Sequence, residues 1–270
     1  MANKGRAVGD VAQAVYPSIH VLVYSDAGGG KSDFAASFSD VPSATPILVW
    51  CWDPFGKETP YLKRGTQKPV EIDAASGTPY VDVLHRQTGA LLIRVEYYLD
   101  ADPQSPEAYA RFLRRMTLFG EEQARWRTVV NDSVTFMELA ARKLQQYHLN
   151  PSAKDPRQWY GGSKESLEEM LMIRFGALPM NVVVCAHVDE DKDEMHGYMV
   201  RYPMAPGKLK KALPSGFGEI YRPYVARDDK GQRVHVMQTQ ADTLWTAASQ
   251  IDAPNPCPNR YADVWRNWKE

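Results

Sequence analysis

The feature that most constrains the fold of this chain is the stretch Ser25-Asp26-Ala27-Gly28-Gly29-Gly30-Lys31-Ser32. It follows an apolar run at residues 19–24 and precedes a small-residue amphipathic segment at residues 33–38, an order that predicts strand, glycine-rich turn and helix. A turn of this kind directs successive backbone N–H groups inward, and the helix N-terminus adds a partial positive charge. The stretch therefore predicts a loop that binds phosphate groups.

The last two side chains of this loop have expected roles. Lys31 would reach the terminal phosphates of a nucleotide, and the Ser32 hydroxyl would ligate a magnesium ion. The usual pattern is G-x-x-x-x-G-K-[ST], and Ser25, a small residue that tolerates the same tight turn, stands at its first position. A flexible glycine turn beside a surface lysine is the alternative interpretation. The predicted nucleotide-binding residues are Ser25, Asp26, Ala27, Gly28, Gly29, Gly30, Lys31, Ser32 and Asp33.

Length, charge and cysteine content limit the class of protein. At 270 residues the chain fits one large α/β domain, or one with insertions. No apolar run approaches the roughly 18 residues that a membrane span needs, and the N-terminus lacks the apolar core of a signal peptide, so we expect a cytoplasmic location and no membrane partner. The wide spacing of Cys51, Cys185 and Cys257 favours buried thiols over a disulfide or a zinc site. With a net charge of −1, binding of nucleic acid would depend on a local basic patch.

The order of apolar runs along the chain predicts strands that alternate with helices around a mostly parallel sheet. The expected core strands lie at residues 19–24, 47–52, 126–131 and 181–186. Two hairpins are expected, one inserted at about residues 80–99 and one formed by residues 221–226 and 233–239.

The remaining segments complete the expected organisation. We expect a helix that opens at Asp102-Pro103, a surface loop at residues 149–163 because proline, glycine and polar groups are frequent there, and a helix at residues 164–178. Thr135 is expected to cap the helix that follows the third core strand. The predicted division is an N-terminal arm at residues 1–18, one domain at 19–245, and a tail at 246–270 that packs on the domain.

Three polar residues follow expected core strands, at the edge of a parallel sheet where ligands bind. Asp132 follows Val129-Val130-Asn131 and is expected to orient magnesium, although an Asp before a helix also serves as an N-cap. Asp53 would polarise the attacking water, or would only begin an Asp-Pro turn. His187 would sense the γ-phosphate, or would be an ordinary hydrogen-bonded histidine.

Several further residues are candidates for catalysis or nucleic-acid binding. Glu58 is the second candidate for the catalytic base. The densest basic cluster comprises Lys208, Lys210 and Lys211, which would bind DNA phosphates, act in trans on a neighbouring subunit's nucleotide, or form a solvated face. Trp50 and Trp52 are expected in the core, whereas Trp159 and Tyr160 are expected in a loop, where bases could stack on them.

Several segments together resemble one family, the phage-encoded RecA-like P-loop ATPases, also described as phage nucleotide-binding proteins. The segments are VLVYSDAGGGKSDFAASF, ILVWCWDP, TVVNDSVTFME, NVVVCAHVDED and PMAPGKLKKALPSGFGEIYRPYV. The resemblance covers roughly residues 19–240, and its more distinctive parts are Ala186-His187 and the run from Leu213 to Arg222. It implies a RecA-like P-loop NTPase fold, with a mostly parallel central sheet flanked by helices and a C-terminal β-hairpin extension.

The resemblance also implies a function. The best-described members are core-only RecA relatives that assist single-strand annealing recombination. By that likeness Lys31 and Ser32 would bind ATP and magnesium, Asp132 would be the Walker B acid and His187 a sensor. The family's acidic group after the second strand falls on Asp53, where the RecA group normally has a glutamate.

The resemblance therefore predicts a phage ATPase in the host cytoplasm that binds ATP and ADP and hydrolyses ATP with Mg²⁺. It would act on single-stranded DNA in recombination or replication, as a homo-oligomer and together with other phage proteins, with Arg222 as a further trans-acting or DNA-binding residue. A nucleotide-bound regulator or scaffold without activity is the main alternative. A small-molecule kinase is the other, and no arginine-rich lid closely follows the expected Walker B strand.

Overall fold

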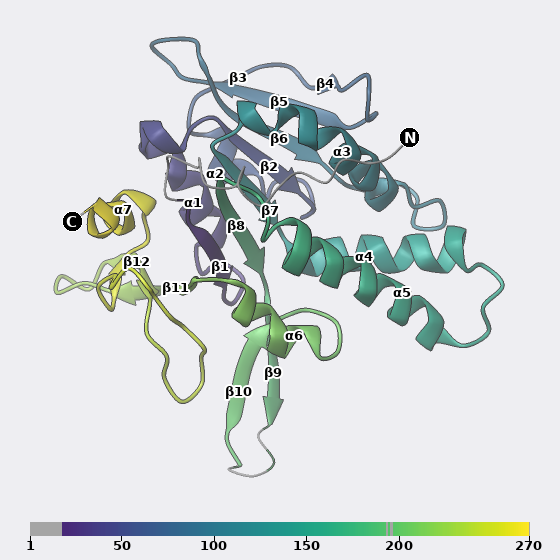
Figure 1. The fold of residues 1–270 in the computed structure, drawn as a ribbon. Helices are drawn as coiled ribbons and strands as arrows, with labels where there is room; N and C mark the ends of the chain where they lie inside the picture. The colour runs from purple at the N-terminus through teal and green to yellow at the C-terminus, as the bar shows by residue number, and fades with distance from the viewer. Residues whose placement is uncertain (1–17, 193, 195–196, 270) are drawn as a thin grey trace, which may run out of the picture.

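A computed structural model describes residues 18–192, 194 and 197–269 of the chain. Helices and strands alternate along most of it, and a large twisted sheet runs through the molecule (Figure 1). The helices are α1 (Lys31–Ala36), α2 (Thr59–Leu62), α3 (Ala108–Glu122), α4 (Val134–Leu144), α5 (Pro156–Glu168), α6 (Leu209–Ala212) and α7 (Tyr261–Lys269). The first seven strands are β1 (His20–Tyr24), β2 (Ile47–Cys51), β3 (Thr66–Gln67), β4 (Glu71–Ile72), β5 (Pro79–Leu84), β6 (Leu91–Tyr97) and β7 (Thr128–Asp132). The others are β8 (Asn181–Ala186), β9 (Val188–Lys192), β10 (Met199–Pro203), β11 (Glu219–Arg227), β12 (Arg233–Gln238) and β13 (Cys257–Pro258).

The centre of the sheet is parallel and its margins are antiparallel. The strand order is β13-β12-β11-β1-β8-β7-β2-β6-β5-β3, with β4 also paired to β5. Neighbouring strands from β11 to β6 run parallel, whereas β12, β13 and β5 join antiparallel. Because parallel strands end at one edge, the ends of β1, β2, β7 and β8 lie together there. The predicted α/β class, with a mostly parallel sheet and a C-terminal hairpin, is confirmed.

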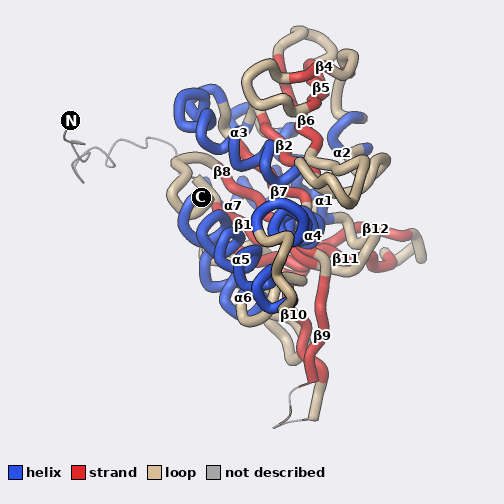
Figure 2. Tube along the Cα trace, turned by 90° about the vertical axis from the view of Figure 1, so that its right-hand side faces the viewer, coloured by secondary structure: helices blue, strands red, loops and turns tan. Residues whose placement is uncertain are grey.

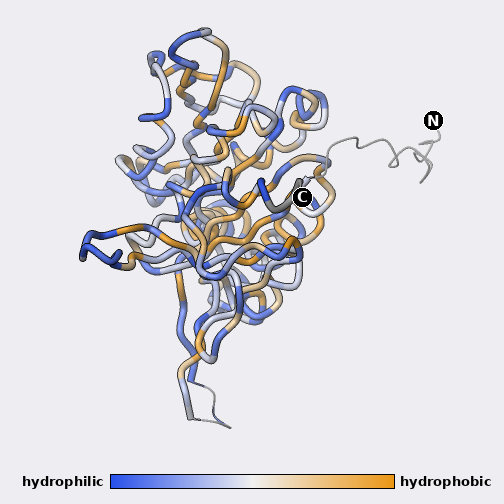
Figure 3. The backbone as a smooth tube through the Cα atoms, turned by 90° about the vertical axis from the view of Figure 1, so that its left-hand side faces the viewer, coloured by the Kyte–Doolittle hydropathy of each residue, from blue (hydrophilic) through white to orange (hydrophobic). Residues whose placement is uncertain are grey.

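Helices cover both faces of the sheet, and the alternation of side chains along the strands divides the core into two layers (Figure 2). In β2, Leu48 and Trp50 face the layer that contains α3, α4 and α5, whereas Val49 and Cys51 face the layer that contains α1 and α7. Strands buried on both faces need nearly continuous apolar sequence, which explains the run Ile47–Cys51. Figure 3 shows hydrophobic segments of the backbone running through the middle of the molecule.

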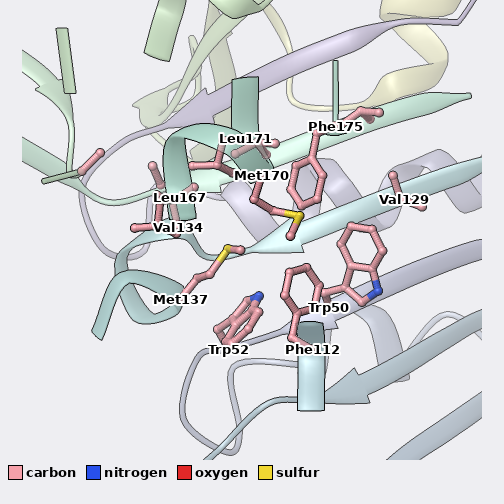
Figure 4. Packing of buried hydrophobic residues seen from close by; sticks show 14 of the residues in the cluster. Trp50, Trp52, Phe112, Val129, Val134, Met137, Leu167, Met170, Leu171 and Phe175 are labelled. Atoms are coloured by element: carbon pink, nitrogen blue, oxygen red, sulfur yellow. The ribbon is translucent and has the colours of Figure 1, made fainter. Parts of the chain in front are cut away.

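An aromatic cluster fills the first of these layers (Figure 4). Trp50 and Trp52 are almost fully buried and pack edge-on against Phe112, with ring centroids 5.3 and 5.0 Å away. The Trp50 ring also stacks on Phe175, at 5.2 Å. The prediction that both tryptophans belong to the core is confirmed.

Three hairpins extend from this body. β5 and β6 form the expected hairpin near residues 80–99, but β6 also pairs parallel with β2, so it lengthens the central sheet. β11 and β12 form the expected C-terminal hairpin, and β11 pairs parallel with β1. β9 and β10 form a separate two-stranded sheet that projects from the body directly after β8 (Figure 1).

Three local predictions are wrong. Residues 156–163 belong to α5 and not to a loop: the Asp155 carboxylate caps this helix by accepting a bond from Arg157 N, and Pro156 suits its first turn. Trp159 and Tyr160 therefore lie on a helix. α3 begins at Ala108, where the Asp100 carboxylate accepts its first N–H groups, and not at 102–103.

The third error concerns the start of α4. The residue before its first turn is Ser133, and Thr135 lies inside the helix. The Thr135 hydroxyl instead accepts a hydrogen bond from His187 N, 3.1 Å away, and so joins α4 to the end of β8.

The ends of the predicted organisation differ in what the structure describes. Of the expected arm at residues 1–18, only Ser18 lies among the described residues. In the tail, Tyr261 stacks on Phe38 with ring centroids 3.6 Å apart. The three cysteines are buried and free. Of the described helices, none has both the length and the apolar character to cross a membrane.

Phe112→Ala should lower the free energy of unfolding by about 3–5 kcal/mol, because it opens a cavity among Trp50, Trp52 and Tyr98. Urea denaturation followed by tryptophan fluorescence measures the change. Phe55→Ala is the matched control: this ring is 76% exposed, and its loss should change stability by no more than about 0.5 kcal/mol. Equal losses in the two variants would contradict the assignment of this core.

Candidate functional site

The phosphate loop lies between the end of β1 and the start of α1. Gly28 and Gly30 have φ angles of 78° and 106°, a left-handed region that favours glycine. At Gly29 a Cβ atom would lie 2.8 Å from the main-chain oxygen of Pro223 in β11, so the neighbouring strand also requires a glycine. The Ser25 side chain occupies the other side of Gly29, which gives this serine a place in the loop.

Lys31 is held inside the loop. Its Nζ donates to the main-chain oxygens of Ser25 (2.9 Å) and Asp26 (3.1 Å), and the residue is 7% exposed. Burial lowers the pKa of the Lys31 ammonium, while the nearby carboxylates of Asp132 and Asp53 favour its charged form. A surface lysine beside a flexible turn would show none of these contacts. The geometry favours a cation positioned for phosphate.

Asp132, at the end of β7, faces the phosphate loop across the sheet edge. Its Oδ2 accepts hydrogen bonds from the hydroxyls of Ser32 and Tyr61, both at 2.7 Å. Burial raises the pKa of Asp132, and the charge of Asp53 raises it further, whereas the two hydroxyls act in the opposite direction. Asp132 therefore contacts the predicted metal ligand Ser32, as a Walker B acid would.

Asp53, after β2, lies in the same group. The Ser133 hydroxyl donates to its Oδ1 at 2.6 Å, and His187 Nε2 lies 3.6 Å from its Oδ2, an ion pair when the imidazole is protonated. His187 Nε2 has no hydrogen-bond partner among the described residues. The structure thus brings the side chains predicted at the ends of β2 and β8 into contact.

Glu58 is also buried, but its environment is different. Its Oε2 accepts a hydrogen bond from Gly56 N at 2.6 Å, within the turn that leads to α2. This carboxylate is therefore engaged in shaping a turn, whereas Asp53 is aimed at His187 across the site.

The lysines of the basic cluster differ in how far their charges are paired with carboxylates of β9. Lys210 Nζ lies 2.7 Å from carboxylate oxygens of both Asp189 and Asp191 on β9. Lys211 Nζ lies 3.8 Å from Asp191, and Lys208 is exposed at the start of α6.

Arg222 belongs to a different neighbourhood. It is half-buried on β11, its guanidinium lies 4.1 Å from the centre of the Trp245 ring, and it donates to Gln238 Oε1 at 3.0 Å. Burial lowers the pKa of Arg222, and the nearby positive charge of Arg201 lowers it further.

Sequence reasoning missed several residues of this site. Arg201 on β10 lies 3.8 Å from the Asp26 carboxylate in the phosphate loop and 2.7 Å from Glu190 on β9. Tyr61 and Ser133 hold the two acids, as described above. Only Ser133 carried a sequence signal, because it directly follows Asp132, the predicted Walker B acid. The others come from segments without a motif.

Comparison with known proteins agrees with this geometry. The model of a family described as AAA domain matches residues 18–250. The chain belongs to the AAA domain family. This AAA domain is a P-loop ATPase fold, so nucleotide binding follows from the family. A search of the curated proteins found no significant match.

Three solved structures show a distant likeness to this AAA domain. A prototypical ATPase from the type III secretion system of pathogenic bacteria is 13% identical, with 79% of this chain and 53% of that chain covered and a TM-score of 0.48. The flagellar accessory protein FlaH from Methanocaldococcus jannaschii is 10% identical, with 86% and 82% covered and a TM-score of 0.41. The RadB recombinase is 14% identical, with 82% and 80% covered and a TM-score of 0.40. The chain spans about half the length of the secretion ATPase.

The residues present fit a nucleotide with magnesium. Among the described residues no group of three or more His, Cys, Asp or Glu side chains could hold a metal alone. Mg²⁺ usually keeps several waters and takes one or two protein ligands together with phosphate oxygens. Ser32 and Asp132, in contact beside the phosphate loop, supply such a partial set.

Asp132→Asn should stabilise the metal-free protein at neutral pH and have less effect near pH 5. Folding raises the pKa of Asp132, so the folded protein favours the protonated carboxyl. This contribution to the free energy of unfolding is fully present below the ordinary carboxyl pKa and is lost as pH rises through the raised value, whereas the neutral Asn side chain does not titrate. Thermal unfolding in chelator between pH 5 and 8 should therefore show a gain for the variant that grows with pH.

The control is Asp229→Asn, in the exposed turn between β11 and β12, which should follow the parent at every pH. A gain for Asp132→Asn that is constant across the range would contradict the assigned environment.

Proposed function

We propose that this protein is an Mg²⁺-dependent ATPase of the phage-encoded RecA-like class, which works as a homo-oligomer on single-stranded DNA in recombination or replication. The observation that carries the ATPase proposal is the convergence of Lys31, the Ser32–Asp132 pair and the Asp53–His187 pair at one sheet edge. The resemblance described above supports the finer assignment.

Each residue has a defined part in this proposal. Bound ATP with magnesium supplies the phosphoanhydride that is cleaved and the charge that neutralises its phosphates. Lys31 binds the terminal phosphates, and Ser32 with Asp132 orients the metal and its waters. Asp53 orients the attacking water and takes its proton, while Ser133 fixes the carboxylate. His187, whose Nε2 atom lies 3.6 Å from Asp53 Oδ2, is the sensor of the γ-phosphate in this proposal.

Asp53 is a better candidate for the base than Glu58. Among the described residues no donor makes a hydrogen bond to Asp53 Oδ2, which faces His187 and has a lone pair available at the sheet edge. Glu58 directs one oxygen into its own turn. The aspartate is shorter than the glutamate that RecA relatives use, and Ser133 offsets this by fixing its direction.

Asp53→Asn should lower ATP turnover at least about 100-fold with little change in ATP affinity, because it removes the base but not the phosphate contacts. Phosphate release with Mg²⁺ measures turnover, and titration with a fluorescent ATP analogue measures binding. Glu58→Gln is the matched control and should keep turnover within about threefold of the parent.

Other outcomes of this experiment are informative. If Glu58→Gln lost ATP turnover and Asp53→Asn kept it, the base would be Glu58 and not Asp53. A parent protein that binds ATP without turning it over would favour a nucleotide-bound regulator. Lys31→Ala, which lacks the loop's cation, should not bind.

The protein should bind single-stranded DNA weakly at low salt, and this binding should disappear at high salt. The paired Lys210 leaves Lys208 and Lys211 as the more accessible charges of the cluster, and each phosphate contact adds to the salt dependence. DNA titration at two salt concentrations tests binding, with Lys208→Ala/Lys211→Ala as the variant and Lys143→Ala/Lys164→Ala, on α4 and α5, as the charge-matched control.

Light scattering with an ATP analogue tests the oligomer. A protein that stays monomeric with nucleotide and binds no DNA at low salt contradicts the recombination assignment while leaving ATP turnover to be judged by the previous experiment.

A further inference from the structure

The segment at residues 251–269, here called the C-terminal segment, lies beside the phosphate loop although the family match ends at residue 250. Its strand β13 pairs with β12, and Figure 1 shows α7 and β12 together at one side of α1. Tyr261 N, at the start of α7, donates to Ser37 Oγ at 2.8 Å, and the Tyr261 ring stacks on Phe38. The C-terminal segment is therefore fixed directly beyond the end of α1.

Two side chains on this side contact carbonyl groups of the loop. Asn259, between β13 and α7, is buried, and its Nδ2 donates to the main-chain oxygen of Gly30 at 2.9 Å. His235 on β12 is exposed, and its Nδ1 lies 3.3 Å from the main-chain oxygen of Gly29. Because a carbonyl oxygen can only accept, this contact is a hydrogen bond when Nδ1 carries the proton. The main-chain N–H of Asn259 donates to the His235 oxygen at 3.2 Å, which joins the two residues.

The approach of these side chains requires a glycine in the loop. A Cβ atom at Gly30 would lie 2.6 Å from Asn259 Nδ2 and 2.9 Å from His235 Nδ1. The Gly30 oxygen also accepts a hydrogen bond from Phe34 N at 2.9 Å, at the start of α1. Asn259 therefore adds a second donor to a carbonyl that the helix already holds, whereas His235 is the donor that the structure gives to Gly29.

These contacts fix the direction of two peptide units in the loop. The peptide bonds Gly29–Gly30 and Gly30–Lys31 are trans, so the C=O and N–H groups of each unit point in opposite directions. A donor on the Gly29 oxygen therefore turns the Gly30 N–H away from His235, and a donor on the Gly30 oxygen turns the Lys31 N–H away from Asn259. Main-chain N–H groups at the start of a helix are the groups that bind phosphate.

We propose that Asn259 and His235 are positioning residues for the phosphate loop, an inference that rests on the proposed ATPase function. Each side chain acts through the loop and not on the phosphates themselves: it holds a carbonyl so that the N–H group of the same peptide unit is directed before the triphosphate arrives. Glycine has no Cβ to restrict its backbone, so without these donors the loop adopts other peptide orientations more readily. The C-terminal segment thus contributes to ATP binding without a phosphate-binding motif of its own.

The first test compares Asn259→Ala with Asn255→Ala, a matched control in the same segment. Asn255 bonds to Thr239 and not to the loop: its Oδ1 accepts from Thr239 N at 3.0 Å. Calorimetric titration with Mg²⁺ measures the affinity for ATP and for inorganic tripolyphosphate, which has the phosphates without the nucleoside. Asn259→Ala should weaken both ligands by the same factor, about five- to tenfold, as expected when a hydrogen bond to a charged group is misdirected. Asn255→Ala should leave both within about twofold of the parent.

The second test uses His235, which is exposed, so that its substitution leaves the core intact. His235→Ala removes the donor to the Gly29 oxygen and should weaken both ligands about threefold or more. His235→Asn places an amide Nδ2 donor near the position of the imidazole Nδ1 and should restore the affinity of the parent. If His235→Asn bound the ligands no better than His235→Ala, the donor role of His235 would be wrong.

The possible failures are distinguishable. If the parent binds neither ATP nor tripolyphosphate, the proposed function is wrong and the inference with it. If the parent binds both, and Asn259→Ala and His235→Ala bind them as well as Asn255→Ala does, the positioning role is wrong while nucleotide binding stands. Weaker binding of ATP with unchanged binding of tripolyphosphate would mean that these residues act on the nucleoside, and it would also overturn the inference.

Discussion

The site depends on a carboxylate that is kept in a place where its charge is costly. Asp132 is 3% exposed and lies near Asp53, so both burial and repulsion oppose its ionised form. The hydroxyls of Ser32 and Tyr61 and the ammonium of Lys31 offset part of this cost. Lys31 and Ser32 belong to the start of α1, and Tyr61 belongs to α2. The acid therefore ties two separate segments to the end of β7, and a divalent cation at Ser32 would relieve the same repulsion.

The parallel register is what brings these groups together. Cys51 in β2 pairs with Asp132 in β7, and Asp132 pairs with Cys185 in β8, so the residues that follow each strand emerge side by side. Asp53 and His187 are the next polar residues on those two strands, and they meet at 3.6 Å. A shift of one residue in either pairing would move each side chain to the opposite face and separate the group.

Much of this arrangement was predictable from sequence because it depends on local patterns. A glycine-rich turn between strand and helix, and acids directly after apolar runs, identify Lys31, Ser32, Asp53 and Asp132 without knowledge of the fold. The segment at 156–163 was assigned wrongly because its glycines and proline suggest a loop, whereas an Asp155 cap and tertiary packing of Leu167 favour a helix.

Other parts of the site were not predictable because their contacts join residues distant in sequence. Asn259 and Gly30 are 229 positions apart, and neither the pairing of β13 with β12 nor the length of the intervening loop has a sequence signal. Tyr61 lies 71 positions from Asp132. Such contacts follow from the strand order, which a single sequence leaves open.

The projecting β9–β10 hairpin is joined to the nucleotide site at both of its strands. β9 begins directly after His187, whose imidazole lies beside Asp53 and whose main-chain N–H bonds to Thr135. On β10, Arg201 lies between Glu190 of the hairpin and Asp26 of the phosphate loop. The two strands are paired along their whole length, from Met199–Lys192 to Pro203–Val188. The hairpin is thus joined to the phosphate loop through Arg201 and Asp26, and to the end of β2 through His187 and Asp53.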